Sequence, residues 1–229
     1  MKNSLARLFT SSVGLKITMA ATGILLLLFV IAHLLGNLQI FLGKEAFNNY
    51  AAFLHSVPEF LWPARIGLLT IFVVHMIFAF KLRSINKSAR PISYQSQNTI
   101  QANPASLYML ETGLVILIFV IIHLLHFTFG KLQPEYFHLM DDKSRIDVYK
   151  TVIRGFDNFT YATLYIFSLL CLGTHLSHAI SSAVHTLGFY DEYYTPCIRK
   201  ASKTIGYGIA LGYISIPLSV QLGILVGGF

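Results

Sequence analysis

Four histidines have the type and the spacing to bind a redox cofactor. His33, His75, His123 and His175 each lie inside a separate long apolar stretch, away from its ends. An ionisable side chain buried in hydrocarbon is costly, and it usually faces the interior of a helix bundle and serves a function there. Because each of four successive stretches carries one histidine, we look for a common cause. Bis-histidine ligation of two haems uses all four.

Two neighbouring histidines leave the choice of ligand open. His126 follows His123 by three positions, and His178 follows His175 by three. Residues three apart lie on the same face of a helix, so each pair shares one face. Either could replace its neighbour as the ligand. Otherwise His126 lies one turn nearer the outer surface, where it could line a quinone pocket, and His178 could contact a haem propionate.

The composition is that of an integral membrane protein. Of 229 residues, 55% are hydrophobic and only 12% are charged, whereas a soluble domain carries roughly 25% charged residues. The net charge of +7 is then explained by basic cytoplasmic loops and not by nucleic-acid binding. We find no internal sequence repeat.

The apolar stretches predict five membrane crossings at about 20 residues each. The predicted fold is all-α, with five transmembrane helices in a single domain, residues 1–229, and the first four helices form the haem-binding bundle. The predicted spans are residues 17–42, 64–83, 107–129, 160–186 and 204–227.

Loop charges predict the orientation, because cytoplasmic loops of membrane proteins carry an excess of Lys and Arg. The segment before the first span and the loop between spans two and three are basic and lack acidic residues, which puts the N-terminus inside and the C-terminus outside. His33 and His123 then lie nearer the outer face, and His75 and His175 lie slightly inward of the midplane. Depth therefore predicts the pairs His33/His123 and His75/His175. The basic residues of these two segments are Lys2, Arg7, Lys16, Lys81, Arg83, Lys87 and Arg90.

Four segments carry a family resemblance. They are HLLGNLQIFLGKEAFNNYAAFLHSVP, HMIFAFKLR, GLVILIFVIIH and GTHLSHAISSAVHTLGF, in that order. With one histidine in each of four spans, the chain resembles over nearly its whole length the b558-type cytochrome b subunit of bacterial succinate dehydrogenase and fumarate reductase. That family forms a single-chain, five-helix membrane anchor with two haems b.

The resemblance implies function and partners. A flavoprotein would oxidise succinate on the cytoplasmic side of the bacterial membrane, and an iron–sulfur protein would carry electrons to this chain. The electrons would pass through the inner and then the outer haem to a quinone, expected to be menaquinone. Fumarate reduction would reverse this path. Local similarity to the family favours His123 and His175 as ligands. Gly173 stands where some menaquinol-oxidising members have a glutamate that is proposed to conduct protons, so that path is not carried over.

Polar residues near the span ends could complete these sites. Haem propionates at the inner level need donors near the cytoplasmic surface, and a quinone needs a polar group at each carbonyl and a proton source. We expect His55 or Glu59 to exchange protons with quinone at the outer face. Propionate contacts are predicted at Ser11, Ser12, Lys16, Arg83 and His178, and quinone-site candidates are Asn48, His55, Glu59 and His126.

Other functions compete with this interpretation. A dihaem quinone cytochrome of another respiratory complex, such as a hydrogenase or a formate dehydrogenase, would share the same histidines. A histidine-based metal or proton transporter is less well supported, because Glu111 is the one carboxylate within the predicted spans and no inverted repeat is evident. A purely structural anchor would leave the four histidines unexplained.

Overall fold

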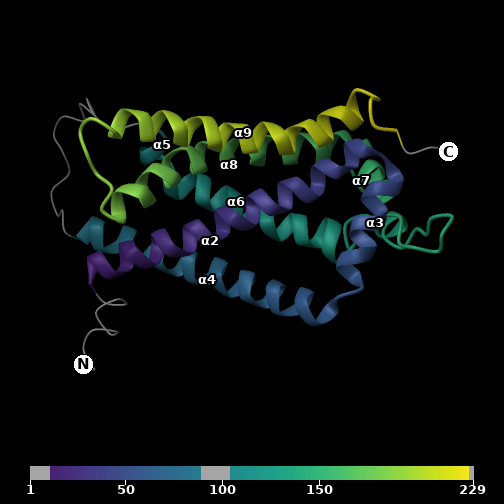
Figure 1. The fold of residues 1–229 in the computed structure, drawn as a ribbon, viewed down its shortest axis with the longest axis horizontal. Coiled ribbons are helices and arrows are strands. Elements are labelled where there is room, and N and C mark those ends of the chain that lie inside the picture. Colours follow the sequence, from purple (N-terminus) through teal and green to yellow (C-terminus); the bar gives the residue numbers. More distant parts are fainter. Residues whose placement is uncertain (1–10, 89–103, 227–229) are drawn as a thin grey trace.

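The computed structural model describes residues 11–88 and 104–226. This part of the chain is helical and contains no β-strand. Four helical segments are long and apolar enough to cross a membrane, which confirms the prediction of an all-α, multi-pass membrane protein. They run side by side along the molecule (Figure 1). These segments are α2 (Ser12–Leu38) with its continuation η1 (Gln39–Leu42), α4 (Pro58–Ser88), α6 (Met109–His123) with η2 (Leu124–Thr128), and α8 (Phe159–Thr186).

The helices extend beyond the predicted spans where the sequence supplies a start signal. α2 begins at Ser12, five residues before the predicted start, because the Ser11 hydroxyl caps it by accepting a hydrogen bond from the Gly14 N–H at 3.0 Å. α4 begins at Pro58, where a proline suits the first turn. Helical structure therefore continues beyond the apolar run into more polar sequence.

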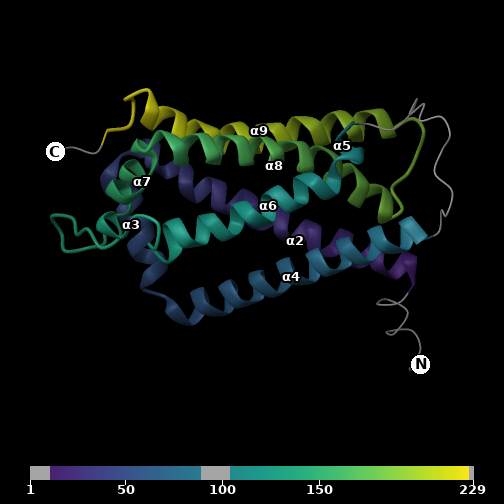
Figure 2. The same cartoon turned by 180° about the vertical axis from the view of Figure 1, so that it is seen from behind.

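A further long helix, α9 (Thr195–Gln221), lies along α8 in both views (Figures 1 and 2). It contains most of the fifth predicted span but is not among the four apolar segments, because glycine, serine and tyrosine alternate with its apolar residues. Its backbone comes very close to that of α8, since a Cβ on Gly206 would lie 2.7 Å from the Ser177 nitrogen. A Cβ on Gly173 would lie 2.9 Å from the Ala210 Cβ, so a glutamate at position 173 would not fit this packing.

Two segments that connect the long helices form short helices at one end of the bundle. α3 (Lys44–His55) follows Gly43, whose φ of +97° turns the chain. α7 (Val148–Asp157) starts at the N-cap Asp147, whose carboxylate accepts from the Lys150 N–H. Ile153 and Phe156 of α7 are buried in the main hydrophobic core, which lies at this end. Burial against the bundle stabilises these helices, which are too polar to stand out in the sequence.

Candidate cofactor site

A large cavity follows the bundle and contains all four span histidines in its wall. Its volume is 2320 Å³, and its lining comes mainly from α2, α4, α6 and α8, with further residues from α3, α7 and α9. Ordinary ligand pockets reach about 1,000 Å³, so this space could hold more than one large cofactor. His33, His75, His123 and His175 line it together.

His33 and His123 face each other across the bundle. The ring centroids of His33 on α2 and His123 on α6 are 5.9 Å apart, and the planes are nearly perpendicular at 83°. Two imidazoles that bind one metal ion from opposite sides, with bonds of about 2.0–2.1 Å, have centroids roughly 6 Å apart. The observed separation therefore fits bis-histidine ligation.

The other two histidines each contact a Thr–Gly pair on a neighbouring helix. Thr22 Oγ1 on α2 lies 3.0 Å from His75 Nδ1 on α4. Thr112 Oγ1 on α6 lies 3.1 Å from His175 Nδ1 on α8. The following glycine makes room for the ring in each case: a Cβ on Gly23 would lie 3.4 Å from His75 Cε1, and one on Gly113 would lie 3.5 Å from His175 Cε1.

These threonines were missed by the sequence analysis, although the sequence holds a signal for them. The pattern Thr-Gly, nine residues, His occurs twice, at 22–33 and at 112–123. At about 1.5 Å per residue, eleven residues separate each threonine from its own helix's histidine by about 16 Å. The cavity therefore has two histidine levels, with His33 and His123 at one and His75 and His175 at the other.

The threonine contacts decide which nitrogen of each imidazole carries its proton. Thr22 donates its hydroxyl hydrogen to the Thr18 carbonyl at 2.8 Å, and Thr112 donates to the Tyr108 carbonyl at 2.8 Å. A hydroxyl has one hydrogen to donate, and with that hydrogen on the carbonyl its oxygen accepts from the imidazole Nδ1–H. Nε2 of His75 and of His175 is then left with a free lone pair, which is the form that binds a metal ion.

His126 has a different environment from His123. Its Nδ1 lies 3.1 Å from Tyr165 Oη, and its Nε2 lies 2.7 Å from Gln133 Oε1. The side chain is 3% exposed. With both ring nitrogens hydrogen-bonded, His126 has none free for a metal ion, which favours His123 as the ligand at this level.

The predicted propionate contacts lie at the opposite end of the cavity. Lys16, Arg83 and His178 line it there, while Ser11 is the N-cap of α2 and Ser12 is the first residue of that helix. His185 also lines this end, and its Nε2 is buried with no hydrogen-bond partner in the described part of the chain. The predicted basic residues Lys2, Arg7 and Arg90 lie outside the described residues.

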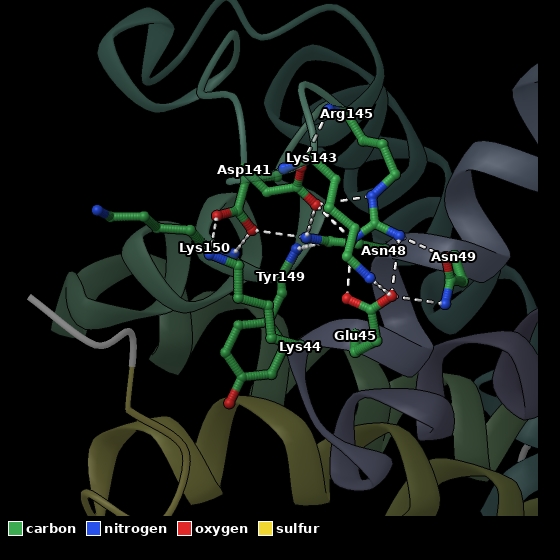
Figure 3. Close-up of polar contacts among 10 residues, drawn as sticks. Lys44, Glu45, Asn48, Asn49, Asp141, Lys143, Arg145, Tyr149 and Lys150 are labelled. Atoms are coloured by element: carbon green, nitrogen blue, oxygen red, sulfur yellow. Dashed lines mark hydrogen bonds and ion pairs between the residues drawn. The ribbon is translucent and has the colours of Figure 1, made fainter.

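The predicted quinone-site residues separate into two groups. His55, at the end of α3, is exposed and lines the cavity, and Glu59 is exposed at the start of α4. Asn48 is fully buried, and its side-chain amide bonds to the segment before α7 and to the start of α7 (Figure 3). It donates to Asp141 at 3.3 Å and to Asp147 at 3.0 Å, and it accepts from the Tyr149 N–H at 3.0 Å.

Charged residues join the same segments. Arg145 donates to Glu45, Asp141 and Asn49, and Lys44 pairs with Asp147 at 3.0 Å (Figure 3). Hydrogen bonds from Arg145 and then Lys143 lower the pKa of Glu45 to about 2. The Arg145 side chain likewise holds the pKa of Asp141 well below its usual range. We call these residues, together with Asn48, the outer clamp, because they tie α3 to the segment before α7.

Comparisons with protein-family profiles, with curated proteins and with solved structures find no match to this chain. Within the described residues no group of three or more His, Cys, Asp or Glu side chains could hold a bare metal ion. A haem needs only two protein ligands. The separation of the His33 and His123 rings fits that requirement, and His75 and His175 line the same cavity.

Proposed function

We propose that this chain is the dihaem cytochrome b and membrane anchor of a bacterial succinate:quinone oxidoreductase, working as a succinate dehydrogenase or a fumarate reductase. The observation that carries the proposal is the pair of threonine contacts, which leave Nε2 of His75 and His175 free to bind iron. The facing rings of His33 and His123 support the second level. The ordered resemblance to the b558-type family names the enzyme.

The four histidines would hold two haems b. His33 and His123 would bind the one nearer the outer face, and His75 and His175 the one nearer the cytoplasmic face. When bound, haem supplies one-electron transfer at an iron that keeps both imidazoles. The chain itself orients the rings, keeps the proton on Nδ1, and excludes water by its apolar lining.

We further propose that α9 is the fifth membrane span. α2 begins at one end of the bundle and α9 ends at the other (Figure 1), as an odd number of crossings requires. Lys16 at the start of α2, Lys81 and Arg83 near the end of α4, and Arg199 in the first turns of α9 all lie at the same end. By the positive-inside rule this end is cytoplasmic, so the N-terminus is inside and the C-terminus outside the bacterial cytoplasmic membrane.

The two ends of the bundle would then serve different partners. The basic cytoplasmic end would dock the iron–sulfur subunit, which carries the flavoprotein. The apolar flanks face lipid. Quinone, as menaquinone, would react near the outer level, where His55 is exposed at the cavity wall and can exchange protons with water, and where Glu59 is exposed nearby.

Haem quantitation on the purified chain tests the proposal. We expect two haems b per chain, and loss of one in each of the variants His33→Ala, His75→Ala, His123→Ala and His175→Ala. The matched neighbours His126→Ala and His178→Ala should keep two. A colourless wild-type protein made with an adequate haem supply would rule out the cytochrome.

A second measurement tests the choice of enzyme. In membranes that contain the intact complex, succinate should reduce the haem b, whereas hydrogen and formate should not. Reduction by formate or hydrogen but not by succinate would assign the chain to another respiratory complex.

A further inference from the structure

The Nδ1 nitrogen of His123 has a different hydrogen-bond partner from the Nδ1 nitrogens of His75 and His175. In place of a threonine, the buried hydroxyl of Tyr165 on α8 lies between two imidazoles. It is 3.5 Å from His123 Nδ1, at the upper limit of a hydrogen bond, and 3.1 Å from His126 Nδ1. The contacts continue from His126 Nε2 to Gln133 Oε1 at 2.7 Å, so they join the bundle interior to the segment that follows η2.

The donors and acceptors in this series can all be satisfied in one direction. If His123 binds iron through Nε2, its Nδ1 carries a proton and donates to the Tyr165 oxygen. The Tyr165 hydrogen is then available to His126 Nδ1, which accepts it. His126 must therefore carry its own proton on Nε2, where the Gln133 carbonyl oxygen accepts. No group in the series is left unpaired.

The local backbone places these groups. The five residues Leu124–Thr128 form a single π-helical turn, η2, and such turns often occur at functional sites. His126 is held between rings, with the Phe127 centroid at 4.0 Å and the Tyr161 centroid at 4.6 Å. α7 closes the remaining side, because a Cβ on Gly155 would lie 3.2 Å from His126 Nε2. The imidazole of His126 is therefore fixed in orientation.

We propose that Tyr165 and His126 are positioning residues for His123. They hold its proton on Nδ1 and increase its electron donation through Nε2, and so lower the reduction potential of the outer level without acting on the inner one. A hydrogen bond to the second nitrogen makes an imidazole ligand more basic, and it is one of the means by which proteins tune haem iron. This inference rests on the proposed function, in which His123 is an axial ligand.

The decisive variant is Tyr165→Phe, which removes one hydroxyl from the series. The matched control is Tyr213→Phe, because the Tyr213 ring centroid lies 6.1 Å from that of His33 at the same level, while its hydroxyl donates to the Val30 carbonyl and not to an imidazole. In redox titrations of the full-length protein, Tyr165→Phe should keep two haems and raise the potential of one by about 59 mV, a tenfold change in the one-electron equilibrium. Tyr213→Phe should change neither potential. Equal shifts in both variants, or none in Tyr165→Phe, would overturn the inference.

A measurement that does not need haem separates this inference from the proposed function. Nitrogen-15 NMR of histidine-labelled full-length protein, assigned with His126→Gln, should show His126 protonated on Nε2. This preference should be smaller in Tyr165→Phe, where only the Gln133 oxygen still supports it. If the wild type binds no haem, this result would retain the hydrogen-bond series while the proposed function fails. If His126 is protonated on Nδ1 in the wild type, the series is wrong whether or not haem is bound.

Discussion

The Thr22 hydroxyl on α2 lies 3.0 Å from Nδ1 of His75 on α4 and donates its own hydrogen to the Thr18 carbonyl. The imidazole is therefore the donor in this contact, and the free lone pair lies on its other nitrogen. The same relationship joins Thr112 and His175. The antiparallel pairs α2/α4 and α6/α8 thus orient a histidine by the same threonine contact.

Removing the Thr22 hydroxyl should weaken haem binding at the inner level. Thr22→Val keeps the side-chain volume but leaves His75 Nδ1 without its partner, and loss of such a partner typically costs 10–100-fold in affinity for the bound metal. Haem titration of the apoprotein measures this. Thr18→Val is the control, because the Thr18 hydroxyl bonds only to its own helix at Gly14. Equal affinities in the two variants would contradict the role of Thr22.

Filling the space beside an inner histidine should block the same level. In Gly23→Leu the new Cβ lies 3.4 Å from His75 Cε1, and the rest of the side chain must enter the cavity. We expect one haem per chain instead of two by pyridine haemochrome assay. Gly67→Leu on α4 should keep both, since a Cβ there meets no atom within 4 Å. Two haems in Gly23→Leu would show that the inner site does not use this face of His75.

The buried amide of Asn48 should be important for stability. Asn48→Ala leaves two buried carboxylates, Asp141 and Asp147, without one donor each. Hydrogen bonds to charged groups contribute about 1.5–3 kcal/mol each. The free energy of unfolding in detergent should therefore fall by about 3 kcal/mol or more. Asn49→Ala, at the exposed side of the clamp, should cost less than about 1 kcal/mol. A similar loss in both variants would argue against a buried structural role for Asn48.

The outer clamp should loosen in acid. The pKa of Glu45 is lowered from 4.5 to about 2 by its hydrogen bonds with Arg145 and Lys143, so the ionised carboxylate favours the folded state. This contribution is fully present above pH 4.5 and is lost as the pH falls toward 2. Thermal unfolding followed by circular dichroism should show this decline. Glu45→Gln should reduce the slope between pH 4.5 and 2, and an unchanged slope would show that Glu45 does not contribute.

Native cysteines can test the proposed orientation. Cys197 is exposed in the first turn of α9, whereas Cys171 lies within α8 and is partly buried. A membrane-impermeant maleimide should label Cys197 in inverted vesicles and leave it unlabelled in intact cells, with Cys171→Ser removing any background. Labelling from the outside of intact cells would reverse the proposed orientation.

The sequence alone determined the features that depend on local composition. Long apolar runs that contain a histidine predict membrane helices with a functional ionisable group. The cost of exposing an apolar run to water and the cost of burying an ionisable group in hydrocarbon both follow from local composition. The membrane character and the helices around His33, His75, His123 and His175 could therefore be predicted. The predicted helix ends were less accurate, since caps such as Ser11 extend a helix into polar sequence.

Only the tertiary structure decided which side chains meet across the bundle. Thr22 and Thr112 look like ordinary small residues of membrane helices until packing brings His75 and His175 against them. His123 and His126 share a helix face in sequence, but the π-helical turn and Tyr165 give them different partners. The helices α3 and α7 depend on burial against the bundle, which is a property of the whole fold. Which side chains meet depends on how distant segments pack together, so these contacts become visible only once the helices are packed.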